Sequence, residues 1–125
     1  MIVIDASALL VLLLKEPGHE KVASHVNGAV ISTVNLSEVL ARLVRHGALP
    51  EDAHPRIGEL GITAINFDAT QAVIAASIRE LARAAGLGLA DCCCLALALG
   101  EQLPVLTADR AWTSLGLAVQ IELVR

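Results

Sequence analysis

The hydrophobic pattern of the chain begins with a short β-branched run, Ile2-Val3-Ile4, which has no polar alternation. Such a run is typical of a strand buried on both faces, as in a parallel sheet covered by helices. Asp5 follows immediately, and residues 6–14 are good helix formers. The sequence therefore predicts that Asp5 lies where a strand ends and a helix begins, at the sheet edge where ligands bind in open α/β folds.

The rest of the chain alternates between short strand-like runs and longer Leu/Ala-rich runs with helical spacing. This pattern predicts further strands at 29–31, 62–67, 103–106 and 119–121. It predicts helices at 19–26, 32–46, 50–60, 68–86 and 90–99, with a short helix after Thr107. Strands separated by helices indicate an α/β fold with a central parallel sheet and right-handed crossovers.

Length and composition favour a single domain spanning residues 1–125. Hydrophobic residues make up 55% of the chain, with one Trp, one Phe and no Tyr, so Leu, Ile, Val and Ala must fill the core. No apolar run reaches the roughly 18 residues of a membrane span, and no cleavable leader opens the chain. The three cysteines are adjacent and cannot build a disulfide framework. We therefore expect a cytoplasmic protein without a membrane anchor.

Four acidic residues share one predicted position in the fold. Asp5 and Asp109 follow strands, Glu38 lies in the first turns of the helix after the second strand, and Asp91 opens an all-apolar helix. In a parallel sheet every strand-to-helix junction lies on the same edge, so we expect these side chains to converge. Hard oxygen ligands of this kind suit Mg²⁺ or Mn²⁺. The hydroxyls of Ser7 and Thr107 lie beside two of these acids and could orient them.

A carboxylate-bound metal of this type is suited to hydrolysis of a phosphodiester, because it activates water and neutralises charge on the phosphoryl oxygens. The net charge of −4 argues at first against a nucleic-acid substrate. However, 13 Asp and Glu minus these four leaves 9, which equals the 9 Lys and Arg. The remainder of the protein is therefore neutral.

Helix capping is the alternative explanation for each acid taken singly, since Asp, Asn, Ser and Thr are favoured at helix starts in any protein. Asn35 and Glu38, for example, have the spacing of a capping box. The set of four is harder to explain in this way. Asp5 and Asp91 lie within strongly apolar stretches, where an unpaired charge is costly unless a cation or hydrogen bonds compensate it.

Four segments together resemble the acidic motifs of PIN-domain nucleases, and more narrowly of VapC-type toxins. They are Ile2-Val-Ile-Asp5-Ala-Ser7-Ala, Asn35-Leu-Ser-Glu38-Val, Gly88-Leu-Ala-Asp91 and Leu106-Thr107-Ala-Asp109-Arg110-Ala-Trp112. The resemblance runs from end to end and implies a three-layer α/β/α fold and Mg²⁺- or Mn²⁺-dependent endoribonuclease activity. It also implies homodimerisation and inhibition by a small VapB-type antitoxin.

By position, the family's metal-site acids correspond to Asp5, Glu38, Asp91 and Asp109, with Ser7 and Thr107 as neighbours. Cys92 is a departure, because many relatives carry a polar or basic residue there. A substrate contact at that position is therefore in doubt.

Arg42 and Arg45 lie four and seven residues after Glu38, on the same helical face. They could carry positive charge from the metal site to an RNA backbone, although solvated surface arginines are common in any protein. The run Leu9–Leu14 is apolar all round, which a dimer or antitoxin surface would explain in part.

Two other functions remain open. The first is a non-catalytic PIN-like module whose acids are caps and whose apolar surface binds a partner; such a module should not be stabilised by Mn²⁺. The second is a metal-dependent phosphatase with Asp5 as nucleophile. That chemistry usually needs a second acid two residues on and a nearby lysine, whereas the chain has Ser7 there and lysines only at 15 and 21.

Overall fold

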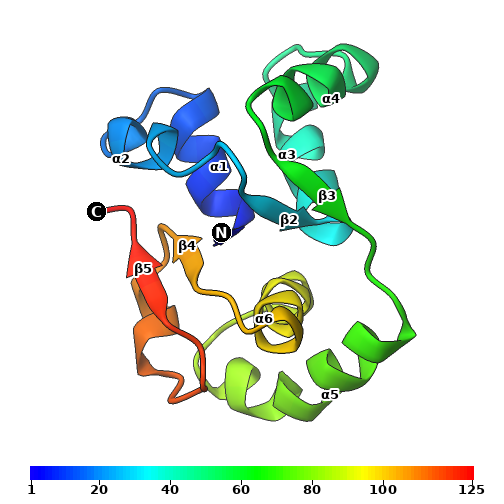
Figure 1. The fold of residues 1–125 in the computed structure, drawn as a ribbon, viewed down its shortest axis with the longest axis vertical. Coiled ribbons are helices and arrows are strands. Elements are labelled where there is room, and N and C mark those ends of the chain that lie inside the picture. Colours follow the sequence, from blue (N-terminus) through cyan, green and yellow to red (C-terminus); the bar gives the residue numbers. More distant parts are fainter.

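Five parallel strands form a single sheet at the centre of the molecule, in the order β3-β2-β1-β4-β5 (Figure 1). The computed structural model describes all 125 residues, Met1–Arg125. The strands are β1 (Val3–Ile4), β2 (Val30–Ser32), β3 (Thr63–Ile65), β4 (Val105–Thr107) and β5 (Ile121–Leu123). The predicted α/β class with a central parallel sheet is confirmed.

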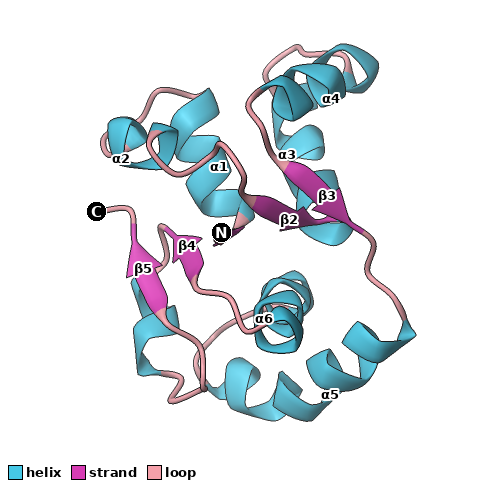
Figure 2. Cartoon of the chain, in the orientation of Figure 1, coloured by secondary structure: helices cyan, strands magenta, loops and turns pink.

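Helices cover both faces of this sheet and give the three layers seen in Figure 2. One face carries α1 (Ala6–Leu13), α2 (His19–Ala23), α3 (Thr33–Arg45) and α4 (Pro50–Glu59). The other carries α5 (Ala69–Ala84), α6 (Leu89–Glu101) and the 3₁₀ helix η1 (Arg110–Ser114). No helix is long and apolar enough to span a bilayer.

Alternation along the strands divides the interior into two cores, one on each face of the sheet. Ile4, Ile31 and Leu106 pack with α1 to α4. Val3 and Val105 pack with the opposite layer, where α6 lies against the sheet and is buried from Cys92 to Ala98. Burial on both faces explains why the strands read as continuous apolar runs without alternation.

The register of the two central strands places Asp5 beside Thr107. Val3 pairs with Val105 and Ile4 with Leu106, and the Asp5 amide donates a hydrogen bond of 2.9 Å to the Leu106 carbonyl. Since β1 occupies the middle of the sheet, Asp5 lies at the centre of its carboxyl edge.

The strand predictions need adjustment at their ends. The final strand is Ile121–Leu123 rather than 119–121, because its pairing with β4 joins Ile121 to Val105 and Leu123 to Thr107. The predicted strand 62–67 contracts to Thr63–Ile65. This strand is at the edge of the sheet, where Thr63 and Ala64 are exposed and only one neighbour supplies hydrogen bonds.

Candidate metal-binding carboxylate site

Asp5 is the buried centre of the site. It is 3% exposed and occupies the N-cap position of α1, where its side chain makes no capping hydrogen bond. Two hydroxyls donate to its Oδ2 oxygen, Ser7 Oγ at 2.6 Å and Thr107 Oγ1 at 2.9 Å. Backbone amides hold these hydroxyls in turn, because Ala108 N donates to Ser7 Oγ and Asp109 N donates to Thr107 Oγ1. The two hydroxyls predicted to orient a carboxylate are therefore brought together on one oxygen of Asp5.

Burial raises the pKa of Asp5 from 3.8 to about 6. The hydrogen bonds from Ser7 and Thr107 act in the opposite direction, and the negative charges of Asp91 and Glu38 raise the pKa further. The charges of two other predicted acids thus act on Asp5. The site has an excess of negative charge that a cation would relieve.

Glu38 is exposed on α3, and Asn35 holds it in place from inside the protein. The fully buried Asn35 side chain donates from Nδ2 to Glu38 Oε1 at 2.8 Å and to the Ala90 carbonyl at 3.1 Å. Ala90 precedes Asp91, so this single amide joins the helices that carry two of the acids. Asn35 Oδ1 is buried without a hydrogen-bond partner.

The capping-box interpretation of Asn35 and Glu38 is wrong. Ser32 is the N-cap of α3, where its hydroxyl accepts a bond from Val34 N, and Asn35 lies inside the helix.

Asp91 and Asp109 both make capping bonds. Asp91 is half-buried at the start of α6, and its Oδ2 accepts a bond of 2.9 Å from Gly88 N. Burial raises the pKa of Asp91, the Gly88 bond lowers it, and the nearby charge of Asp109 raises it. Asp109 is exposed and accepts from Ala111 N at 2.9 Å as the N-cap of η1.

Each of the four carboxylates therefore uses one oxygen in a local hydrogen bond, while the other accepts no hydrogen bond from the protein. In this arrangement, however, no three His, Cys, Asp or Glu side chains form a group that could hold a metal ion. The acids share the carboxyl edge of the sheet without forming a closed cage.

The predicted RNA-contacting arginines lie next to this edge. Arg42 and Arg45 line a hollow of about 320 Å³ together with Glu38 and Leu10. Neither guanidinium forms an ion pair with a carboxylate.

The three cysteines take no part in the site. Cys92, Cys93 and Cys94 are free and buried, and burial raises the pKa of each thiol. High thiol pKa values disfavour the reactive thiolate. The three thiols are therefore in the environment of inert packing residues.

Comparison with known proteins places this arrangement in a family. The model of the PIN domain family matches residues 2–116. The chain belongs to the PIN domain family. PIN domains are in general nucleases that use divalent metals, and the fold and the carboxylate edge of this PIN domain agree with that class.

Solved structures share the fold at low sequence identity. A chain of a toxin–antitoxin complex from Klebsiella pneumoniae matches with a TM-score of 0.74 and 17% identity, covering 97% of this PIN domain and 100% of that chain. A DNA-bound VapBC structure from Salmonella typhimurium matches with a TM-score of 0.71 and 17% identity over the full length of both chains. FitAcB from Neisseria gonorrhoeae matches with a TM-score of 0.68 and 23% identity, covering 97% of this chain and 96% of the other. No curated protein sequence matches the chain.

The residues present fit a hard divalent cation by their chemistry. The donors are carboxylate oxygens, four of which have no hydrogen-bond partner in the protein, and the buried Asp5 carries a destabilised charge. Asp5, Glu38, Asp91 and Asp109 would hold the ion in this PIN domain.

Proposed function

We propose that this PIN domain is a Mg²⁺- or Mn²⁺-dependent endoribonuclease that acts as the toxin of a VapBC-type toxin–antitoxin pair in the cytoplasm. The observation that carries the proposal is the environment of Asp5. Its carboxylate is buried at the centre of the carboxyl edge, is held by two hydroxyls, and is surrounded by the charges of further acids. Such a group is costly to fold unless a cation compensates it.

When bound by the four acids, the divalent ion would activate a water molecule and neutralise charge that develops on the phosphoryl oxygens. Ser7 and Thr107 fix one oxygen of Asp5 and so set the direction of the other. Asn35 donates to both Glu38 and the Ala90 carbonyl and so holds Glu38 in a defined position relative to the start of α6. Arg42 and Arg45 would bind RNA backbone phosphates at the hollow beside Glu38.

The proposed partner is a VapB-type antitoxin, together with a second copy of the chain. Structures of this fold come from toxin–antitoxin complexes. A groove of about 450 Å³ between α1, α3 and α4 is lined by apolar side chains, among them Leu13, Leu43 and Ile57. Leu49 lies in the same groove and is 57% exposed. A surface of this kind fits the apolar face of a partner helix.

The non-catalytic partner-binding module remains the second candidate, because no three acids already form a group that could hold a metal ion. The two functions differ in their response to Mn²⁺. The nuclease should gain thermal stability with the metal, whereas the module should not.

The decisive experiment is incubation of purified protein with a total RNA pool in Mn²⁺ or Mg²⁺, followed by mapping of the new RNA ends. We expect cleavage that disappears with a chelator and falls more than about 100-fold in Asp5→Asn, since a proposed ligand should matter more than a neighbour of a ligand. Glu101→Gln, which removes an exposed charge at the far end of α6, is the matched control and should cleave normally. Intact RNA from folded protein that Mn²⁺ does not stabilise would favour the partner-binding module.

A further inference from the structure

The chain beyond β5 reaches the same sheet edge as Asp5. Strand β5 runs parallel to β4, Leu123 pairs with Thr107, and Val124 N donates to the Thr107 carbonyl at 2.9 Å. Thr107 is the residue whose hydroxyl holds Asp5. Residues 124–125 therefore lie next to the proposed metal site, although they are more than 100 positions from Asp5 in the sequence.

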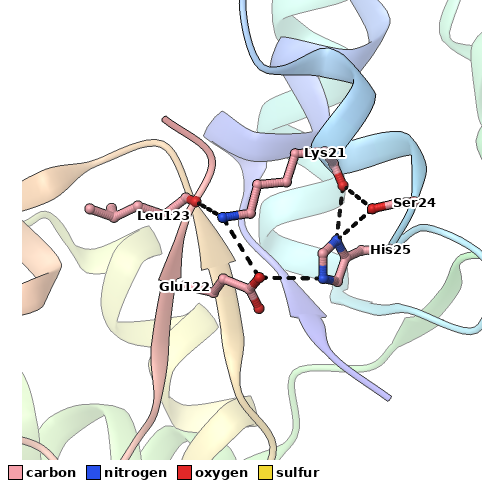
Figure 3. A network of polar contacts seen from close by, with 5 residues as sticks. All are labelled: Lys21, Ser24, His25, Glu122 and Leu123. Atoms are coloured by element: carbon pink, nitrogen blue, oxygen red, sulfur yellow. Dashed lines mark hydrogen bonds and ion pairs between the residues drawn. The ribbon is translucent and has the colours of Figure 1, made fainter.

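A polar network anchors this end of the chain to α2 (Figure 3). Lys21 Nζ donates to the Leu123 carbonyl at 2.6 Å and lies 3.7 Å from Glu122 Oε1, while His25 Nε2 lies 3.5 Å from the same oxygen. Gly18, at the N-cap position of α2, has a φ of +97°. A Cβ at this position would lie 2.7 Å from Val124 Cγ1. The close packing and the polar contacts together hold the backbone before Arg125 in one position.

The side chain of Arg125 is oriented but not neutralised. Its Nη1 donates to the Pro17 carbonyl at 2.7 Å. No carboxylate lies within ion-pairing distance of Arg125 or of Arg42. A guanidinium has five donors in a planar fork, so the bond to Pro17 leaves Arg125 with donors for an anion.

A hollow of about 190 Å³ joins these two arginines to the carboxylate site. Its lining includes Arg42 from α3, Arg125, and Ser7, the residue that donates to Asp5. Arg42 and Leu10 also line the neighbouring hollow that contains Glu38 and Arg45. Glu16 is the single acid in the lining and is not ion-paired with either arginine.

We propose that Arg42 and Arg125 form a phosphate subsite for the RNA backbone, adjacent to the phosphodiester that is cleaved. This inference rests on the proposed ribonuclease function and adds a residue, Arg125, that the acidic motifs do not contain. An RNA strand is favoured over an acidic peptide because Ser7, which lines the hollow, donates to Asp5, one of the residues that would act on a phosphodiester. Two arginines in the lining of one hollow suit a backbone phosphate, and they offset locally the excess of acids at the edge.

The test is binding of a fluorescently labelled single-stranded RNA, followed by anisotropy between 50 and 200 mM salt, which is the range over which phosphate contacts are revealed. The full-length chain would carry Asp91→Asn so that the RNA is not cut, with Mg²⁺ present. Each phosphate contact contributes roughly 0.7 to the slope of log K against log salt for single strands. We expect Arg125→Gln to reduce the slope by about 0.7, and Arg42→Gln with Arg125→Gln to reduce it by about 1.4.

Two further variants control this experiment. Arg125→Lys keeps the charge and should keep the slope, which separates loss of a phosphate contact from a local folding defect. Arg83→Gln removes an exposed arginine that pairs with Glu80 on α5, and it should behave as the parent.

A parent-like slope in Arg125→Gln would overturn the subsite and leave the nuclease proposal intact. Absence of RNA binding by the parent, together with intact RNA in the cleavage assay, would overturn both. A loss of salt slope that is equal in Arg125→Gln and Arg125→Lys would also overturn the subsite, because the slope would then not depend on the positive charge at this position.

Discussion

Asp5 and Asp109 follow neighbouring parallel strands at the same sheet edge, yet their surroundings differ. Asp5 is 3% exposed, receives two hydroxyl donors and has a pKa raised to about 6 by burial. Asp109 is exposed and uses one oxygen to cap η1. The position after a strand therefore determines where a carboxylate lies. The packing around the carboxylate determines how much its negative charge destabilises the folded protein.

The cost of the Asp5 charge should appear as pH-dependent stability of the metal-free protein. Between pH 3.8 and about 6 the folded protein retains a proton that the unfolded chain has released, so stability falls as pH rises through this window. The difference of about two pKa units corresponds to roughly 3 kcal/mol. We expect Asp5→Asn to remove most of this pH dependence and to be more stable than wild type at pH 7 by up to about 3 kcal/mol.

Urea denaturation at pH 5 and pH 7 in the presence of a chelator measures both quantities. Glu101→Gln is the matched control, because it removes an exposed carboxylate at the far end of α6 and leaves the surroundings of Asp5 intact. Equal pH profiles for Asp5→Asn and wild type would show that the Asp5 charge is compensated within the protein.

Thr107 connects the two acidic residues. Its hydroxyl donates to the Asp5 carboxylate and accepts from the backbone amide of Asp109. Thr107→Val preserves the shape and removes both bonds. We expect the pKa of Asp5 to rise further and Mn²⁺ affinity to fall about 10- to 100-fold, as for other residues that orient a ligand. Thr107→Ser should restore both properties. Calorimetric titration with Mn²⁺ is the measurement, and wild-type affinity in Thr107→Val would contradict this role.

The sequence was sufficient for the parts of the site that depend on local pattern. The β-branched run before Asp5, the helical spacing after Ser32 and the apolar helix after Asp91 each predict their element and the place of its acid. The rule that parallel strands end at one edge then predicts that the acids approach one another. In the structure their charges influence one another in pairs, but no three of them form a group that could hold a metal ion.

What the sequence could not reveal depends on pairing between distant segments. The spacing of Asn35 and Glu38 suggested a capping box, whereas the link from Asn35 to Ala90 spans 55 positions that no local pattern connects. Arg125 was missed for a different reason. With the last strand expected at 119–121, Arg125 lies four residues beyond its end, whereas the observed pairing of Leu123 with Thr107 brings it to the site.

Asn35 extends the comparison to Glu38, an exposed acid held by a buried neighbour. Asn35→Ala removes the donor to Glu38 Oε1 and to the Ala90 carbonyl, and we expect a loss of about 1–3 kcal/mol in the free energy of unfolding. Ser37→Ala, on the exposed face of the same helix, should change it by less than about 0.5 kcal/mol. Thermal or urea denaturation measures the difference. Equal stabilities of the two variants would show that the link between α3 and α6 is not stabilising.

The smallest expected change in stability is at Asp109, and it distinguishes capping from metal binding. Asp109→Asn retains a side-chain oxygen for Ala111 N and should leave stability unchanged, whereas Asp109→Ala removes the cap at a cost of about 1 kcal/mol. If Asp109 is a metal ligand, both variants lose Mn²⁺ affinity regardless of their stability. If it is only a cap, Asp109→Asn binds Mn²⁺ and cleaves RNA as wild type does. Stability and metal affinity measured on the same two proteins therefore decide whether the exposed acid shares the role proposed for the buried one.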